Sequence, residues 1–207
     1  MCSSRSHWND VPGVKTETSV SWYQPHSLRS LALINHISPD GTASVIDVGA
    51  GASTLVDDLV SRGFADITAL DIAAPALQRA KTRLGKGADK VTWLTADVTL
   101  WTPARTWDIW HDRALFHFLT DRDSQDAYIS TLSAATRPGS TAIISTFTVG
   151  APQSCNGLPV EQYSAECLAA RLGPAFALAM QGVEHHTMPS GADQLFLYAV
   201  LNRRRES

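Results

Sequence analysis

Cysteine is scarce in this chain of 207 residues, and the few cysteines form no pattern. Cys2, Cys155 and Cys167 are odd in number, and none belongs to a Cys-x-x-Cys pair. Because a disulfide framework needs paired cysteines and a zinc knuckle needs closely spaced ones, we expect neither, and we assign no metal. So few thiols fit a reducing cytoplasm, which is the location we predict.

Long apolar runs and an excess of positive charge are also missing. No run approaches the roughly 18 apolar residues of a transmembrane helix, and residues 1–10 are polar, without the apolar core of a signal peptide. Lys and Arg number 17 against 20 Asp and Glu, and the formal net charge is -3, so nucleic acid has no basic face to bind. We therefore expect neither a membrane nor a nucleic acid as partner.

What the chain does contain is an alternation of strand-like and helix-like segments from about residue 26 onward. The predicted strands are apolar runs that end near turn residues: 44–48, 67–70, 91–95, 107–111 and 141–147. The predicted helices are 27–37, 53–61, 74–84, 121–136 and 165–172. A loop over 150–162 and two strands, 176–180 and 195–201, follow. This order predicts a parallel sheet with helices on both faces.

A glycine turn follows the first predicted strand, in the run VIDVGAGAS. Asp47 lies in the strand, and Gly49 and Gly51 follow before the next helix. Glycines let a backbone approach a ligand closely, and a helix N-terminus presents free N–H groups. A lone Gly-x-Gly ends many strands without binding anything, so this motif needs support from elsewhere.

Two further aspartates supply that support. Asp71 ends the second predicted strand, about twenty residues after the glycines, and Asp97 follows the third. In doubly wound folds an acidic residue at the first of these places accepts hydrogen bonds from ribose hydroxyls. Since parallel strands end on one edge of the sheet, both aspartates and the glycine turn are expected at the edge where ligands bind.

From about residue 44 to residue 147 the chain resembles the class I S-adenosylmethionine-dependent methyltransferases. Their motifs occur in order as DVGAG, ALDIA, TADV and RPGSTAIIS, with Ser53 where the family often has glycine. The resemblance implies an α/β fold with a Rossmann-like, doubly wound sheet of seven strands. That sheet would be mostly parallel, with one antiparallel strand near the C-terminus. The cofactor implied is S-adenosylmethionine.

The resemblance also implies a role for each motif residue. Gly49 and Gly51 would pass close to the methionine part of the cofactor, with Asp47 near its amino group, and Asp71 would bind the ribose. The residues expected at the adenine are Ile72, Asp97 and Val98. NAD is the competing cofactor, but a carboxylate at Asp47 would repel a pyrophosphate and suits an ammonium group.

The predicted strand at 107–111 leads into a second informative segment, HDRALFHF. Asp112 and Arg113 are expected at the carboxyl edge of the sheet, beside the transferable methyl, and His117 follows in a short helical turn as a possible proton acceptor. The alternative is a surface ion pair next to a core aromatic cluster. The order Asp108, Asp112, Arg113 and Ala114 resembles the thiopurine methyltransferase group, whose pattern is Asp, three residues, Asp-Arg and a small residue.

That group also has an N-terminal tryptophan segment that closes over the cofactor. Its counterpart here contains Trp8 and Trp22, expected at the cofactor, and Tyr23, expected at the acceptor with Arg113. We therefore divide the chain into an N-terminal lid segment, residues 1–25, and a single methyltransferase domain, residues 26–207.

The resulting hypothesis is methyl transfer from S-adenosylmethionine to a small-molecule acceptor, a thiol or another nucleophile, held near Asp112 and Arg113. Catalysis would rest on positioning and on exclusion of water. A protein-lysine methyltransferase is one alternative, so a protein substrate stays possible. A non-catalytic module that keeps the cofactor pocket is another. The expected oligomeric state is a monomer.

Overall fold

A computed structural model describes residue 8, residues 23–188, residue 191 and residues 193–205. The main sheet has eight strands, one more than predicted: seven follow the order β3-β2-β1-β4-β5-β10-β9, and the short β8 pairs with β5 off this path. The parallel strands of its first part are β1 (Val45–Val48), β2 (Ile67–Asp71), β3 (Val91–Thr95), β4 (Trp107–Arg113) and β5 (Thr136–Thr148). β10 (Asp193–Arg203) runs antiparallel to both β5 and β9 (Phe176–Thr187). The predicted fold class, including its antiparallel strand near the C-terminus, is confirmed.

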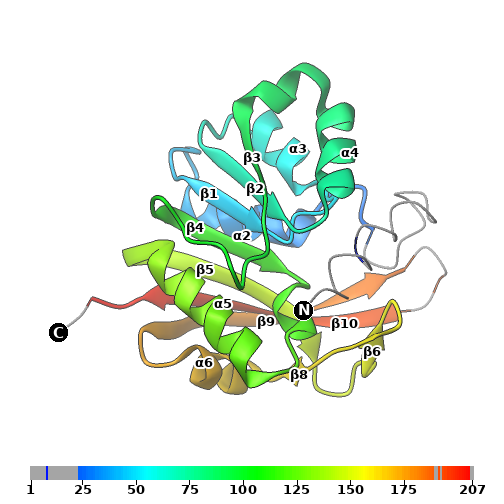
Figure 1. The fold of residues 1–207 in the computed structure, drawn as a ribbon, viewed down its shortest axis with the longest axis vertical. Coiled ribbons are helices and arrows are strands. Elements are labelled where there is room, and N and C mark those ends of the chain that lie inside the picture. The colour runs from blue at the N-terminus through cyan, green and yellow to red at the C-terminus, as the bar shows by residue number, and fades with distance from the viewer. Residues whose placement is uncertain (1–7, 9–22, 189–190, 192, 206–207) are drawn as a thin grey trace.

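Helices cover both faces of this sheet (Figure 1). They are α2 (Leu28–Ile37), α3 (Leu55–Ser61), α4 (Ala74–Leu84), α5 (Arg122–Ala134) and α6 (Ala165–Leu172), with short 3-10 turns η2 (Gly85–Lys90) and η3 (Phe116–Phe118). Ile34 of α2 packs in one core, which includes Ile109 of β4, while Tyr128 of α5 packs in the other, which includes Trp110. Because successive side chains of a strand point to opposite faces, β4 alternates between the two cores.

Two strands are longer than their apolar runs predicted. β5 begins at Thr136 and so includes Pro138 and Gly139, which lie between the predicted helix 121–136 and the predicted strand 141–147. A register shift between Trp107 and Ile109 of β4 accommodates this irregular start. β9 continues to Thr187 because it pairs with β10 along its whole length, although much of it alternates between half-buried and exposed residues.

The predicted loop over 150–162 contains short strands. They are β6 (Ser154–Cys155) and β7 (Leu158–Pro159), which pair with each other, and β8 (Gln162–Tyr163), which pairs with the end of β5. No helix in the part of the chain described here is long and apolar enough to span a membrane.

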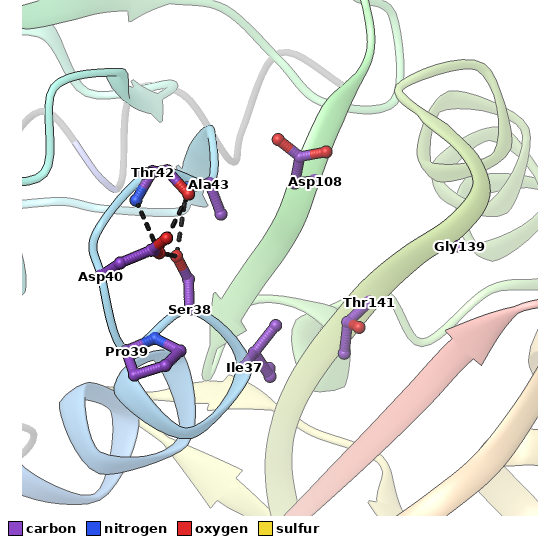
Figure 2. A pocket seen from close by; sticks show the side chains of 9 residues that line it. All are labelled: Ile37, Ser38, Pro39, Asp40, Thr42, Ala43, Asp108, Gly139 and Thr141. Atoms are coloured by element: carbon purple, nitrogen blue, oxygen red, sulfur yellow. Dashed lines mark hydrogen bonds between the residues drawn. The ribbon is translucent and has the colours of Figure 1, made fainter.

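A hollow lies at the amino ends of β4 and β5 (Figure 2). Its residues come from the end of α2, the turn that follows it and the two strands: Ile37, Ser38, Pro39, Asp40, Thr42, Ala43, Asp108, Gly139 and Thr141. Asp40 accepts hydrogen bonds from the hydroxyls of Ser38 and Thr42 at 3.1 and 2.9 Å, so this polar cluster is closed on itself. The hollow lies at the edge of the sheet opposite the glycine turn.

Candidate functional site

The glycine turn after β1 is folded tightly against the ends of β2 and β4. Gly49 and Gly51 have φ of +71° and +53°, a region that favours glycine. A Cβ on Gly49 would lie 2.7 Å from Leu115 Cδ1, so a larger residue has no room there. The N–H groups of Gly49 and Ala50 both donate to the carbonyl of Leu70, at 2.8 and 3.1 Å.

Asp71, at the end of β2, braces this turn. Its Oδ2 accepts the Gly51 N–H at 2.8 Å and its Oδ1 accepts the Ala73 N–H at 2.7 Å. Burial, and then the nearby charge of Asp47, raise the pKa of Asp71 to about 6, although these backbone donors oppose the shift. Each carboxylate oxygen has room for a second donor, so the half-buried side chain can still accept from a ligand's hydroxyl groups.

The third turn lies next along the same edge. Asp97 Oδ1 accepts hydrogen bonds from the Thr99 N–H at 2.9 Å and the Thr99 hydroxyl at 2.6 Å. The backbone N–H of Ala96 donates to the carbonyl of Asp71 at 3.0 Å, which joins the turns after β2 and β3. Val98 is buried, while Asp97 and Ile72 are half-buried beside it. The structure thus brings the predicted cofactor turns to one edge of the sheet.

Asp47 is buried beneath the glycine turn and is held by a histidine that the sequence analysis did not select. Asp47 Oδ1 lies 2.7 Å from His111 Nδ1, and His111 Nε2 lies 2.8 Å from Ser30 Oγ. Asp47 Oδ2 is buried and has no hydrogen-bond partner within the described part of the chain. Asp47 and His111 are direct neighbours across β1 and β4, a pairing that is visible only once the strand order is known.

Asp112 and Arg113, which the sequence analysis placed together, lie on opposite faces of the sheet. This correction follows from the alternation of side chains along β4. Asp112 is fully buried toward α5, where it accepts hydrogen bonds from the Leu115 and Phe116 N–H groups and, at 2.6 Å, from the Tyr128 hydroxyl. Burial raises the pKa of Asp112 to about 6, while those donors oppose the shift. Its carboxylate therefore holds the turn after β4 and does not face Arg113.

The turn after β4 also explains the small residue in the Asp-Arg motif. Ala114 has φ of +68°, which a bulky or β-branched residue would adopt only at a cost. Asp108, the first residue of that motif, lies at the other end of β4, where it accepts hydrogen bonds from Ser44 and pairs with Arg137. Asp108 is therefore remote from the glycine turn.

Arg113 points to the same face as Asp47. Its Nε donates to the Tyr198 hydroxyl at 3.2 Å, and its Nη2 lies 4.0 Å from Glu184 Oε2. The guanidinium also lies over the ring of Phe196, 4.9 Å from its centroid. The positive charge of Arg113 is therefore matched by a partly buried carboxylate on β9.

His117, in η3, holds a proton where the sequence analysis expected a proton acceptor. Its Nδ1 accepts the Phe147 N–H at 3.1 Å, so in the neutral ring Nε2 carries the hydrogen. Burial, and then the charge of Arg113, lower the pKa of His117 to about 3. Nε2 is buried and has no hydrogen-bond partner among the described residues, so His117 has a donor available but no basic nitrogen.

Aromatic rings surround His117. Phe118 and Phe147 lie 4.5 and 4.8 Å from it between ring centroids, and Phe196 stacks on it at 6.4 Å. Trp8 meets Phe118 edge-on at 4.9 Å, so the N-terminal segment reaches this cluster. Tyr23 is half-buried, and Trp22 lies outside the described residues.

No group of three or more His, Cys, Asp or Glu side chains that could hold a metal ion occurs within the described ranges. The groups that the structure brings to this edge are three aspartates, a narrow glycine turn, one paired arginine and several aromatic rings.

Comparison with known proteins agrees with this geometry. Residues 45–139 match the model of a family described as a methyltransferase domain. Proteins named uncharacterized methyltransferases in Mycobacterium tuberculosis and Mycobacterium bovis are 35% identical over 128 residues. The match covers 61% of this chain and spans 61% of the length of each of those relatives.

Solved structures share the fold over nearly the whole chain. An S-adenosylmethionine-dependent methyltransferase from Anabaena variabilis has a TM-score of 0.74 at 15% identity, covering 98% of this chain and 94% of that one. A structure described under the conversion of a disulfide bond into a thioacetal group during echinomycin biosynthesis has a TM-score of 0.74 at 18% identity, with the same coverage. The Burkholderia thailandensis 1,6-didemethyltoxoflavin-N1-methyltransferase has a TM-score of 0.67 at 18% identity, covering 99% and 85%.

The fold is the one that solved S-adenosylmethionine-dependent methyltransferases share, and residues 45–139 match a methyltransferase domain. The relatives are named methyltransferases, and some of the similar structures contain S-adenosylhomocysteine.

Proposed function

We propose that this chain transfers the methyl group of S-adenosylmethionine to a small-molecule acceptor that lies beside Arg113 and the aromatic cluster around His117. The observation that carries the proposal is the carboxyl edge of the sheet. The glycine turn, Asp71 and Asp47, whose buried Oδ2 has no hydrogen-bond partner among the described residues, all lie at this edge.

The residues present fit the cofactor. Leu115 occupies the position that a Cβ at Gly49 would take, so the turn stays a bare glycine backbone, which suits close approach of the methionine part. Asp47 Oδ2 is a buried acceptor without a donor, as expected if an ammonium group completes it. The carboxylate of Asp71 would take the ribose hydroxyls, and Ile72, Asp97 and Val98 would line the adenine. When bound, S-adenosylmethionine supplies an electrophilic methyl group.

On the acceptor side, charge balance favours an uncharged molecule. Arg113 is already opposed by Glu184, so an anionic acceptor would have to displace that carboxylate. The rings of Phe118, Phe147 and Phe196 offer apolar walls for a planar acceptor. His117 Nε2–H can donate a hydrogen bond to it, and this role replaces that of a base.

Two of the similar structures concern small molecules. One acts on 1,6-didemethyltoxoflavin, and the other concerns a disulfide bond in echinomycin biosynthesis. They support a small-molecule acceptor with a nucleophilic nitrogen or sulfur. We also propose that residues 1–25 act as a lid over this site, because Trp8 contacts the cluster at Phe118. The likeness of the Asp-Arg motif to the thiopurine methyltransferase group stays part of this proposal.

Calorimetry with S-adenosylhomocysteine and NAD tests the cofactor. We expect S-adenosylhomocysteine to bind with a dissociation constant in the micromolar range or below, about 8 kcal/mol, and NAD not to compete. Binding of NAD with no signal from S-adenosylhomocysteine would contradict the proposal.

A product-release assay tests the acceptor. S-adenosylhomocysteine formation is measured with thiols, phenols, carboxylates, heterocyclic amines and a lysine-bearing protein. We expect turnover with uncharged aromatic nucleophiles, and Arg113→Ala should lower kcat/KM by roughly 30- to 1000-fold while cofactor affinity changes much less. Turnover with the protein alone would replace the small-molecule proposal by protein-lysine methylation.

A further inference from the structure

A chain of hydrogen bonds runs along one face of the sheet, from Arg113 on the proposed acceptor side to Asp47 on the proposed cofactor side. Arg113 Nε lies 3.2 Å from the Tyr198 hydroxyl, which lies 3.3 Å from Ser30 Oγ. Ser30 Oγ lies 2.8 Å from His111 Nε2, and His111 Nδ1 lies 2.7 Å from Asp47 Oδ1. All members except Arg113 are buried, and they come from β4, β10, α2 and β1.

One consistent set of directions for these hydrogen bonds follows from the arginine end of the chain. Arg113 can only donate, so Tyr198 accepts from it. The Tyr198 hydroxyl can then donate its own hydrogen to Ser30 Oγ. Ser30 can in turn donate to His111 Nε2, when His111 carries its hydrogen on Nδ1.

The consequence for His111 and Asp47 is specific. With Nε2 accepting, Nδ1 carries the hydrogen and donates it to Asp47 Oδ1. Every donor in this set points toward the Asp47 carboxylate, and one of its two oxygens accepts from His111. The other oxygen, Oδ2, is buried and has no hydrogen-bond partner among the described residues.

We infer that His111 and Tyr198 are positioning residues that fix the Asp47 carboxylate so that Oδ2 receives the ammonium group of the cofactor's methionine part. This inference rests on the proposed function. Neither residue touches the cofactor: His111 acts through Asp47, and Tyr198 acts through Ser30 and His111. Arg113 supports the chain from its far end through its donation to Tyr198.

The test compares two ligands. S-adenosylhomocysteine contains the amino group, whereas 5′-methylthioadenosine keeps the adenosine and lacks the amino-acid part. We expect His111→Gln, which cannot donate to Asp47 from the Nδ1 position, and Tyr198→Phe to weaken S-adenosylhomocysteine binding by about tenfold or more. Binding of 5′-methylthioadenosine should change less than about twofold.

His111→Asn is the matched control, because its amide can occupy the Nδ1 position and donate to Asp47 Oδ1. It should recover most of the affinity that His111→Gln loses. A purely structural role would weaken both ligands together, and equal loss in all three variants, or no loss in any, would overturn the inference. If wild-type protein binds neither ligand, it is the proposed function that fails. Circular dichroism and urea denaturation identify any variant that does not fold, and Tyr198→Phe and His111→Gln provide independent tests.

Discussion

Asp71 combines two demands that conflict when the site holds no ligand. In the proposed contact with ribose hydroxyls its carboxylate accepts best when ionised, yet burial and the charge of Asp47 raise its pKa to about 6. A raised carboxyl pKa contributes stability that is present below the unfolded value of 3.8 and is lost as the pH rises through 6. At neutral pH the buried Asp71 carboxylate is therefore ionised with few hydrogen-bond donors around it, and hydroxyl groups of a ligand would supply more.

We predict that cofactor affinity falls at low pH because of this residue. Below pH 6 Asp71 takes up a proton, so the affinity for S-adenosylhomocysteine should drop by about tenfold per pH unit. Calorimetry from pH 5 to pH 8 checks this. Asp71→Asn serves as the control: its affinity should be lower at pH 7 by about 1.5–3 kcal/mol and nearly flat with pH. Identical slopes in both proteins would assign the titration to another group.

Asp112 shows why a motif of adjacent residues can mislead. The sequence correctly located the end of β4 within two residues, but the side chains of neighbouring strand residues leave on opposite faces. Asp112 therefore accepts a hydrogen bond from Tyr128 of α5 on one face, and Arg113 donates to Tyr198 of β10 on the other. Knowing the helix and strand ranges was insufficient, because which face holds the cofactor depends on the packing of α2 and α5.

Tyr128 of α5 helps to hold the turn that leads into η3. The Tyr128 hydroxyl donates to Asp112 Oδ2 at 2.6 Å and accepts from Trp110 Nε1 at 2.9 Å, and all three side chains are fully buried. Burial, together with the charge of Asp112, raises the pKa of Tyr128 well above 10, so the hydroxyl keeps its proton. This arrangement holds Leu115 above Gly49, where it shapes the glycine turn.

We expect Tyr128→Phe to lower the free energy of unfolding by about 2–3 kcal/mol at pH 7, because it leaves a carboxylate and an indole N–H each short of a partner. The loss should be smaller at pH 5, where Asp112, whose pKa is about 6, is protonated. Urea denaturation at the two pH values measures this. Tyr163→Phe is the control, since that buried hydroxyl accepts one bond from Gln125, and its loss should cost about 0.5–1.5 kcal/mol at either pH. Equal losses in the two variants would exclude a special role for the Asp112 contact.

Element existence was predictable from the sequence, whereas contacts between distant elements were not. Apolar runs located β1, β2 and β3 within a residue, and the aspartates at their ends meet because parallel strands share an edge. The α2 helix was also found, but on it the apolar Leu28 is 69% exposed, while the polar Ser30 is fully buried. Ser30 and Tyr198 are 168 positions apart, and no spacing rule reveals that they form a hydrogen bond.

Across the whole molecule one sheet contains two halves, with β4 between them. We call β1 to β3 the cofactor half and β5, β10 and β9 the acceptor half, after their proposed roles. Both cores extend under the two halves: one contains Leu55 of α3 together with Phe196, and the other contains Leu70 together with Leu168 of α6. A ligand that joins the turns after β1, β2 and β3 should therefore stabilise the acceptor half as well, since no boundary separates the two.

We predict a single thermal transition that cofactor binding moves as a whole. At a ligand concentration of 100 times the dissociation constant, binding stabilises the native state by about 2.7 kcal/mol. For a chain of this size each kcal/mol raises Tm by about 2–4 °C, so S-adenosylhomocysteine should raise Tm by about 5–10 °C, and NAD should leave it unchanged. Scanning calorimetry compares the calorimetric and van't Hoff enthalpies, which should agree if the domain unfolds in one step.

Asp47→Asn should reduce the ligand-induced rise in Tm, because a neutral amide attracts the ammonium group far less than a carboxylate does. Two transitions, of which the ligand moves only one, would show that β9 and β10 unfold independently of the cofactor half, contrary to the continuity of the two cores.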